Sequence, residues 1–140
     1  MRKSLVLSVA FILFLLTSCY QKETISSKLA MEMDVKKIAV SRIEDSGSLA
    51  ELNGQDANKL LEVIFHHAIK QEGIANMSSP EYMVKLYTKA DAKQIYVWVG
   101  KTGETSSLML EDDTHTIYTV STKVTATLND LLAISLNSSN

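Results

Sequence analysis

The chain begins with a short basic stretch and an apolar run, and this start constrains everything that can fold after it. Two basic residues come first, an uncharged apolar run follows over residues 4–16, and the small residues Thr17 and Ser18 lead into Cys19. This order is the layout of a secretory signal peptide. A membrane-spanning helix needs about 20 apolar residues, and this run is shorter. The sequence therefore predicts export, with residues 1–18 as the signal peptide.

The stretch Leu16-Thr17-Ser18-Cys19 resembles the lipobox of bacterial lipoproteins, in which a leucine and two small residues precede a cysteine. The resemblance implies a diacylglyceryl group joined to the Cys19 sulfur by a thioether, and a cut before Cys19 that exposes an amino group for a further acyl chain such as palmitate. Two or more acyl chains give stable anchoring, whereas one is marginal. The alternative is an uncleaved signal anchor with an incidental cysteine. We expect a lipid-anchored protein on the extracytoplasmic face of the cell membrane, with the membrane as a partner through Cys19.

The composition of the mature chain excludes several kinds of site. Cys19 is the only cysteine, so its lipidation would rule out a disulfide, a cysteine-ligated metal and a cysteine nucleophile. Removal of residues 1–18 takes away two basic residues and no acidic ones, so the formal net charge changes from −2 to −4. Binding to phosphate backbones needs clustered Lys and Arg, so we expect no nucleic acid partner. The remaining length suits one domain that is held together by packing alone.

The polar stretch after the signal peptide divides the mature chain. We expect residues 19–34 to be a tether, residues 35–136 to be a single domain and residues 137–140 to be a polar tail. As a flexible coil of about 15 residues, the tether would have an r.m.s. reach of roughly 20 Å.

Within the domain, alternating apolar residues predict strands and apolar residues at helical spacing predict helices. In chain order we expect a strand over 35–43, a helix from Asp56 to a natural stop at Gly73, strands over 82–88, 94–100, 107–111 and 116–121, and a last helix from Ser121 or Thr122. The short connections favour an antiparallel meander. The predicted fold class is α+β: a mostly antiparallel sheet of about five strands with two amphipathic helices on one face, in the order β-α-β-β-β-β-α.

Three pieces of this domain carry a resemblance to a family. They are Ser79-Pro-Glu-Tyr82, Ile95-Tyr-Val-Trp98, and the run from Asp113 to Ser121 before the last helix. Together they resemble the YhfM-like domain of small uncharacterised lipoproteins from Bacillus and relatives, over most of residues 35–135. The resemblance implies a membrane-anchored extracytoplasmic protein of a Gram-positive bacterium. The family supplies no established activity, so the resemblance implies no catalytic residues.

One face of the predicted sheet is rich in aromatic side chains. Successive strand residues point to opposite faces, and the aliphatic set suits packing under the helices. The opposite, open face then carries Lys85, Tyr87, Tyr96, Trp98 and Met109. We predict that this face binds an envelope protein, a peptide or a glycan. Two alternatives stay open: the tether, a loop or the flank of the first strand covers the face, or the aromatic residues form cross-strand pairs that stabilise an exposed sheet.

The three histidines do not form a recognisable metal site. His66 and His67 are adjacent, so on a helix they point about 100° apart and do not converge on one ion. Glu62 and His66 have i,i+4 spacing, and His115 follows two aspartates, but these ligands are loosely placed. We expect no metal, no cofactor and no catalytic residue in a non-enzymatic binding module. The alternatives are a small metal-dependent enzyme or accessory factor that uses the histidines, and an inhibitor or immunity lipoprotein.

Overall fold

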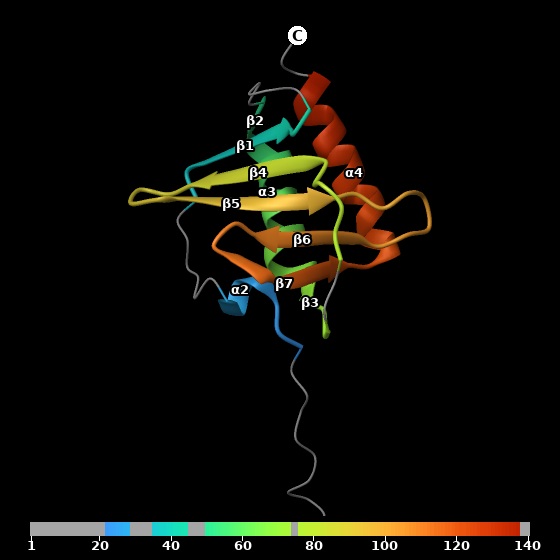
Figure 1. Cartoon of the computed structure of the whole chain (residues 1–140). Helices are drawn as coiled ribbons and strands as arrows, with labels where there is room; N and C mark the ends of the chain where they lie inside the picture. The colour runs from blue at the N-terminus through green and yellow to red at the C-terminus, as the bar shows by residue number, and fades with distance from the viewer. Residues whose placement is uncertain (1–21, 29–34, 45–49, 74–75, 138–140) are drawn as a thin grey trace, which may run out of the picture.

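The computed structural model describes residues 22–28, 35–44, 50–73 and 76–137 (Figure 1). The predicted lipobox and the apolar run before it lie outside these residues, as do residues 29–34 of the expected tether. The elements, in chain order, are α2 (Ile25–Lys28), β1 (Lys37–Arg42), β2 (Ala50–Leu52), α3 (Gly54–Glu62), the π-helical turn η1 (Val63–His67), β3 (Ile69–Lys70), β4 (Tyr82–Tyr87), β5 (Ala92–Trp98), β6 (Ser106–Leu110), β7 (Asp113–Val120) and α4 (Thr122–Asn137).

The strands form one antiparallel sheet. Its seven strands lie in the order β2-β1-β4-β5-β6-β7-β3. The centre of the sheet is the meander β4 to β7, in which each strand pairs with the next one in the chain. β1 pairs with the other edge of β4, so these two neighbouring strands are separated by a long stretch of chain.

Local turn chemistry explains why the meander closes tightly. Between β4 and β5, the Thr88 hydroxyl accepts a hydrogen bond from the backbone N–H of Asp91 at 3.0 Å, and this side-chain bond closes the turn. Between β5 and β6, Gly103 has φ +85°, a conformation that L side chains rarely adopt. A Cβ at Gly100 would collide with the backbone carbonyl of Thr105, so this hairpin also needs glycine where its two arms meet.

The helices α3 and α4 lie on the same side of the sheet (Figure 1). Apolar side chains of alternate strand positions face them and form one core, whose fully buried members include Leu60, Ile64, Val84, Ile95, Val97, Leu108, Leu128 and Leu132. Burial of each such side chain contributes about 1.5–3 kcal/mol, which lets a domain without a disulfide stay folded. Inside this core the Ser106 hydroxyl donates to the Thr125 hydroxyl at 3.0 Å and links β6 to α4.

The predicted α+β class is confirmed, with an antiparallel sheet and two longer helices, whereas the strand number and order are corrected. The pattern misses β2 and β3, which have three and two residues. The helix does not run on to Gly73, because Ala68 has an extended backbone at φ −84° and ψ 107° and the next two residues pair with β7. Strands this short are below the window in which an alternation of polar and apolar residues can be recognised.

The segment that follows the predicted lipobox is part of the folded domain. Thr24 forms an antiparallel bridge with Ile69 of β3. The Lys70 N–H donates to the Glu23 carbonyl at 2.7 Å, and the Ile25 N–H donates to the Ala68 carbonyl at 3.3 Å. The Ile25 side chain is fully buried in the core. Residues 22–28 therefore depart from the flexible coil expected over 19–34, because a single apolar side chain and an open strand edge hold them in place.

None of the helices among the described residues is both long enough and apolar enough to cross a bilayer.

Candidate functional site

The strands present the predicted face on the side of the sheet away from α3 and α4. One row of residues in cross-strand register runs across this face, from Met83 of β4 through Tyr96 of β5 and Met109 of β6 to Ile117 of β7. Trp98 lies two residues beyond Tyr96 on the same strand and so on the same side. We call these five residues the central patch: Met83, Tyr96, Trp98, Met109 and Ile117.

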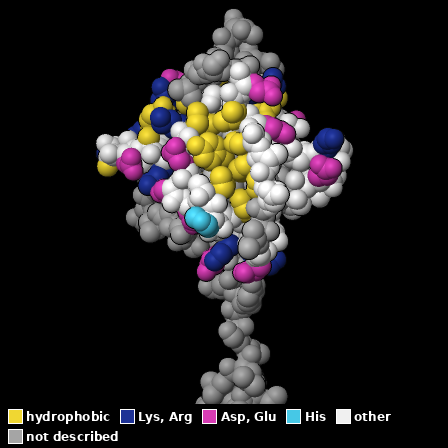
Figure 2. Space-filling model, in the orientation of Figure 1, with side chains coloured by type: hydrophobic (Ala, Val, Ile, Leu, Met, Phe, Trp, Pro, Cys, Tyr) yellow, Lys and Arg dark blue, Asp and Glu magenta, His cyan; other side chains and the backbone are white. Residues whose placement is uncertain are grey.

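The central patch is apolar and largely half-buried. Figure 2 shows hydrophobic side chains gathered over β4, β5 and β6 on this face of the molecule. Met83, Tyr96, Trp98 and Met109 are each half-buried, and Ile117 is 8% exposed. A partly exposed apolar face of this kind can pack against a second surface.

A loop borders the patch at Trp98. The connection between β3 and β4 passes in front of the sheet (Figure 1), and its residue Ser78 accepts a hydrogen bond from the indole N–H of Trp98 at 2.8 Å. Glu81 continues this contact, since its N–H donates to the Val97 carbonyl at 3.1 Å and its carboxylate accepts the Val99 N–H at 3.3 Å. The expected alternative of a covering loop therefore applies to the Trp98 end of the face. The bond also fixes the indole ring in one orientation.

Two lysines flank an aromatic ring at another part of the face. The ammonium groups of Lys37 and Lys85 each lie 5.6 Å from the centroid of the Tyr87 ring. Cations at this distance are attracted to the ring face. Lys37 is also paired with Glu51, and the hydrogen bond to this carboxylate raises the pKa of Lys37. Within the described part of the chain no carboxylate pairs with Lys85, so Lys85 offers a positive charge beside the central patch.

A polar corner completes the surroundings of the patch. The Gln94 side-chain amide donates to the Tyr96 hydroxyl at 3.1 Å and to the Glu111 carboxylate at 3.2 Å. The five residues predicted for the face, Lys85, Tyr87, Tyr96, Trp98 and Met109, thus lie on one side of the sheet. Alternation along β4 also places Met83 on this face, although the prediction did not count it among the candidates, whereas Ile117 was missed because its place beside Met109 depends on the register between β6 and β7.

The histidines lie apart from the central patch and from one another. The π-helical turn η1 brings Glu62 within 3.8 Å of His67, an i,i+5 pair, whereas the sequence spacing had pointed only to Glu62 and His66 as neighbours at i,i+4. A π-turn has more residues per turn than an α-helix, which accounts for the change of partner. His66 and His115 are exposed. Among the described residues no three His, Cys, Asp or Glu side chains come close enough to hold a metal ion.

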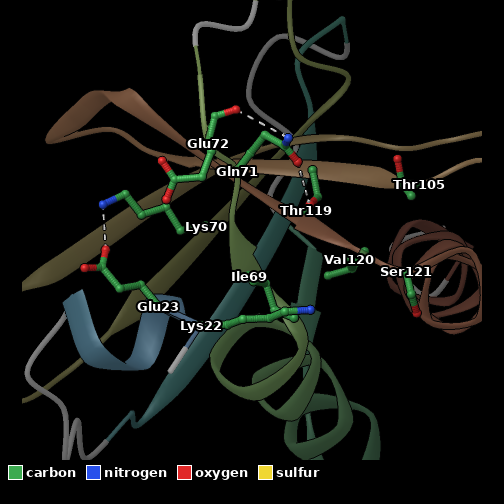
Figure 3. Close-up of a pocket in the computed structure, with 10 residues that line it drawn as sticks. All are labelled: Lys22, Glu23, Ile69, Lys70, Gln71, Glu72, Thr105, Thr119, Val120 and Ser121. Carbon is green, nitrogen blue, oxygen red and sulfur yellow. Dashed lines mark hydrogen bonds and ion pairs between the residues drawn. The ribbon is translucent and has the colours of Figure 1, made fainter. Parts of the chain in front are cut away.

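A pocket of about 480 Å³ lies where the N-terminal segment meets the sheet edge (Figure 3). Its walls come from Lys22 and Glu23, from β3 and the residues after it, and from the end of β7. The Lys70 ammonium donates to the Glu23 carboxylate at 2.6 Å, and this bond raises the pKa of Lys70. The sequence gives no signal for this pocket because distant segments form it. Lys70 and Glu23 in its wall pair with each other, and no histidine or cysteine is among its lining residues.

Comparisons with known proteins place the domain in a family. A family model described as YhfM protein matches residues 31–137, which is most of the chain and covers the sheet, both longer helices and the central patch. No curated protein and no solved structure matched the chain. Residues 22–28, which pair with β3 and bury Ile25, precede the region that the family model matches; we call them the docked segment. The chain belongs to the YhfM protein family.

Proposed function

We propose that this protein is a lipid-anchored binding module on the outer side of the cytoplasmic membrane, and that it contacts another envelope component through the central patch. The anchor is supported by the apolar run over 4–16 and by the lipobox-like stretch that ends at Cys19. Binding is supported by one observation above the others: the row from Met83 to Ile117 is apolar, and α3 and α4 pack on the opposite side of the sheet. Apolar surfaces gathered on one face mark contact sites more often than chance.

The physical form of the patch fits this role. Tyr96 and Trp98 supply large contact areas, and the hydrogen bond from Trp98 to Ser78 holds the indole ring in place before binding. Aromatic side chains dominate the energetics of contact surfaces, and ordering them in advance lowers the entropy lost on association. Met83 and Met109 add flexible side chains that adapt to a partner's shape. An inhibitor or immunity factor would be one example of such a module.

The test for binding replaces one residue at the centre of the patch. Met109→Glu introduces a charge among apolar neighbours and should abolish the partner recovered by crosslinking in intact cells. Ile134→Glu is the matched control, because Ile134 is an exposed apolar residue of α4, 46% exposed and on the other side of the domain. Circular dichroism should show both variants folded. Equal recovery of the partner with both variants would refute the role of the patch, and unfolding of Met109→Glu alone would make Met109 a structural residue.

The test for the anchor is independent of the patch. Mass spectrometry of the mature N-terminal peptide should find a diacylglyceryl group on Cys19, and Cys19→Ala should release the protein from the membrane fraction. An unmodified Cys19 in a membrane-bound protein would support the uncleaved signal anchor instead.

A further inference from the structure

A continuous row of paired residues across the sheet connects residues 22–28, the segment that follows the predicted lipobox, to the central patch. Thr24 pairs with Ile69 of β3, Ile69 with Thr119 of β7, Thr119 with Ser107 of β6, and Ser107 with Trp98 of β5. The four intervals in this row, at about 4.8 Å each, span roughly 19 Å. The patch is therefore a fixed distance from the residue at which the chain leaves the folded domain.

The free length between the predicted lipid and the domain is very short. Lys22 is the first described residue, so at the least Tyr20 and Gln21 separate Cys19 from the domain. From Cys19 to Thr24 is five residues, which span at most about 18 Å when fully extended. Thr24 is itself bridged to Ile69, and Ile25 is fully buried, so this segment cannot extend further without breaking the fold. The two spans together keep Trp98 within about 40 Å of the acylated residue in any orientation.

From these distances we propose that the partner of the central patch is a different protein of the same membrane, whose contact segment lies beside the bilayer and presents aliphatic side chains flanked by a carboxylate. This inference rests on the proposed anchor and binding function. The attachment keeps Trp98 within about 40 Å of the acylated residue, a distance that the extracytoplasmic part of another membrane protein can cover. The carboxylate is the complement of Lys85, whose ammonium lies beside the patch with no carboxylate partner among the described residues.

The chemistry of the patch disfavours the lipid bilayer as its occupant. A surface that enters the headgroup layer inserts protruding Trp, Phe or Leu side chains several ångströms deep. Here Tyr96 and Trp98 are half-buried and the indole N–H is already bonded to Ser78. The formal charge of −4 for residues 19–140 also repels an anionic bilayer.

A glycan is disfavoured for a related reason. Sugars need several hydrogen-bonding groups beside an aromatic platform. Beside Tyr96 the Gln94 amide is already bonded to the Tyr96 hydroxyl and to the Glu111 carboxylate, and the residue in register with Trp98 is Ser107, which offers one hydroxyl. Met83, Met109 and Ile117 offer only apolar contact to a sugar ring. A protein segment with aliphatic side chains matches the apolar row from Met83 to Ile117.

The experiment changes the length of the attachment and leaves every described contact intact. A flexible Gly-Ser linker of about 20 residues is inserted between Gln21 and Lys22 of the full-length protein, which adds an r.m.s. span of roughly 25 Å. The matched control carries the same linker after Asn140. Trp98 is the only tryptophan, so energy transfer from Trp98 to dansyl-labelled headgroups reports its distance from the bilayer once the purified lipoproteins are placed in phospholipid vesicles.

We expect efficient energy transfer in the wild type and the control, and a clear decrease with the inserted linker. Equal transfer in all three proteins would overturn the inference, since the docked segment would then not set the height of the patch. Quenching of Trp98 by lipids brominated in their acyl chains would also overturn it, because the bilayer would then occupy the patch.

The partner is tested in cells with a photocrosslinking benzophenone amino acid at Met109. We expect an adduct with a different membrane protein, whose yield falls about fivefold with the inserted linker because effective concentration decreases as a linker lengthens. Replacement of Lys85 by Glu should decrease the yield as well. An adduct that carries sugar, or one with a second copy of this chain, would overturn the inference. A mature peptide without lipid on Cys19 would instead refute the proposed anchor, and the two failures are therefore distinguishable.

Discussion

Lys70 bonds to Glu23 twice, through its backbone N–H to the Glu23 carbonyl at 2.7 Å and through its ammonium to the Glu23 carboxylate at 2.6 Å. The pair joins the first described residues of the chain to β3, an edge strand of the sheet. The ion pair is exposed to solvent, so it orients the segment more than it stabilises it. The stabilisation comes from the neighbouring Ile25, which is fully buried.

The first prediction concerns this segment. Ile25→Ala should lower the free energy of unfolding by about 2–5 kcal/mol, because it removes a fully buried side chain and leaves a cavity. Chemical denaturation of the mature domain measures the change. Ser26→Ala is the matched control, since Ser26 is the next residue and is only half-buried, and it should have little effect. Equal stability of the two variants would mean that the segment does not belong to the cooperative fold.

The second prediction concerns the loop beside the patch. Trp98→Phe keeps an aromatic ring but removes the N–H that bonds to Ser78. The loss of this bond should lower stability by about 1 kcal/mol and increase hydrogen exchange over residues 76–81.

Tyr96→Phe serves as the control for that variant, because it removes a hydroxyl that accepts a bond from Gln94 and touches no part of the loop. Hydrogen exchange over residues 76–81 should stay unchanged in Tyr96→Phe. An increase of equal size in both variants would show that the loop responds to any change in the patch.

The third prediction concerns alkaline pH. A hydrogen bond to Asp112, with a further contribution from Asp91, raises the pKa of Lys93 above its ordinary value of 10.5. A group whose pKa is raised in the folded state stabilises the fold below its unfolded pKa, and this stabilisation is lost as the pH rises through the folded pKa. Stability should therefore decrease above about pH 10.5, and it should decrease less in Lys93→Met. Thermal unfolding measured from pH 8 to pH 11 checks this, and parallel curves for both proteins would contradict it.

The fourth prediction concerns the buried link between the sheet and α4. The Ser106 hydroxyl donates to Thr125 and accepts the Gly100 N–H at 3.0 Å. Thr125→Val should destabilise the domain by about 1–3 kcal/mol, because the Ser106 proton is then left without an acceptor. Chemical denaturation measures the free energy of unfolding of Thr125→Val, of Ser106→Ala and of the double variant. The decrease in the double variant should be smaller than the sum of the decreases in the two single variants, and strict additivity would show that the two hydroxyls are not coupled.

The sequence predicts the centre of this fold well and its edges poorly. β4 and β6 alternate buried and half-buried residues throughout, and β5 does so from Gln94 on, so the faces of these strands can be assigned from the sequence. β3 has two residues and is defined only by its pairing with β7, a contact made across nearly fifty residues of chain. Ile25 is a lone apolar residue in a polar stretch, and no period identifies it as part of the core.

For the candidate site, too, the sequence predicts what depends on one strand and misses what depends on contacts between distant segments. Alternation places Tyr96 and Trp98 on one face, and the structure agrees. The row that joins Tyr96 to Met83 and Ile117 depends on the register of neighbouring strands, which a single strand does not carry. The contact between Trp98 and Ser78 depends on which side of the sheet the long connection from β3 crosses, and this choice leaves no trace in the local sequence.

The bridge between Thr24 and Ile69 has a consequence for solubility. An open sheet edge is a template for pairing with another chain. The bridge covers part of β3, and the other edge strand, β2, has three residues with the charged Glu51 in the middle. Both ends of the sheet are thus poor templates for edge-to-edge pairing between two copies of this chain, the first step toward fibrils.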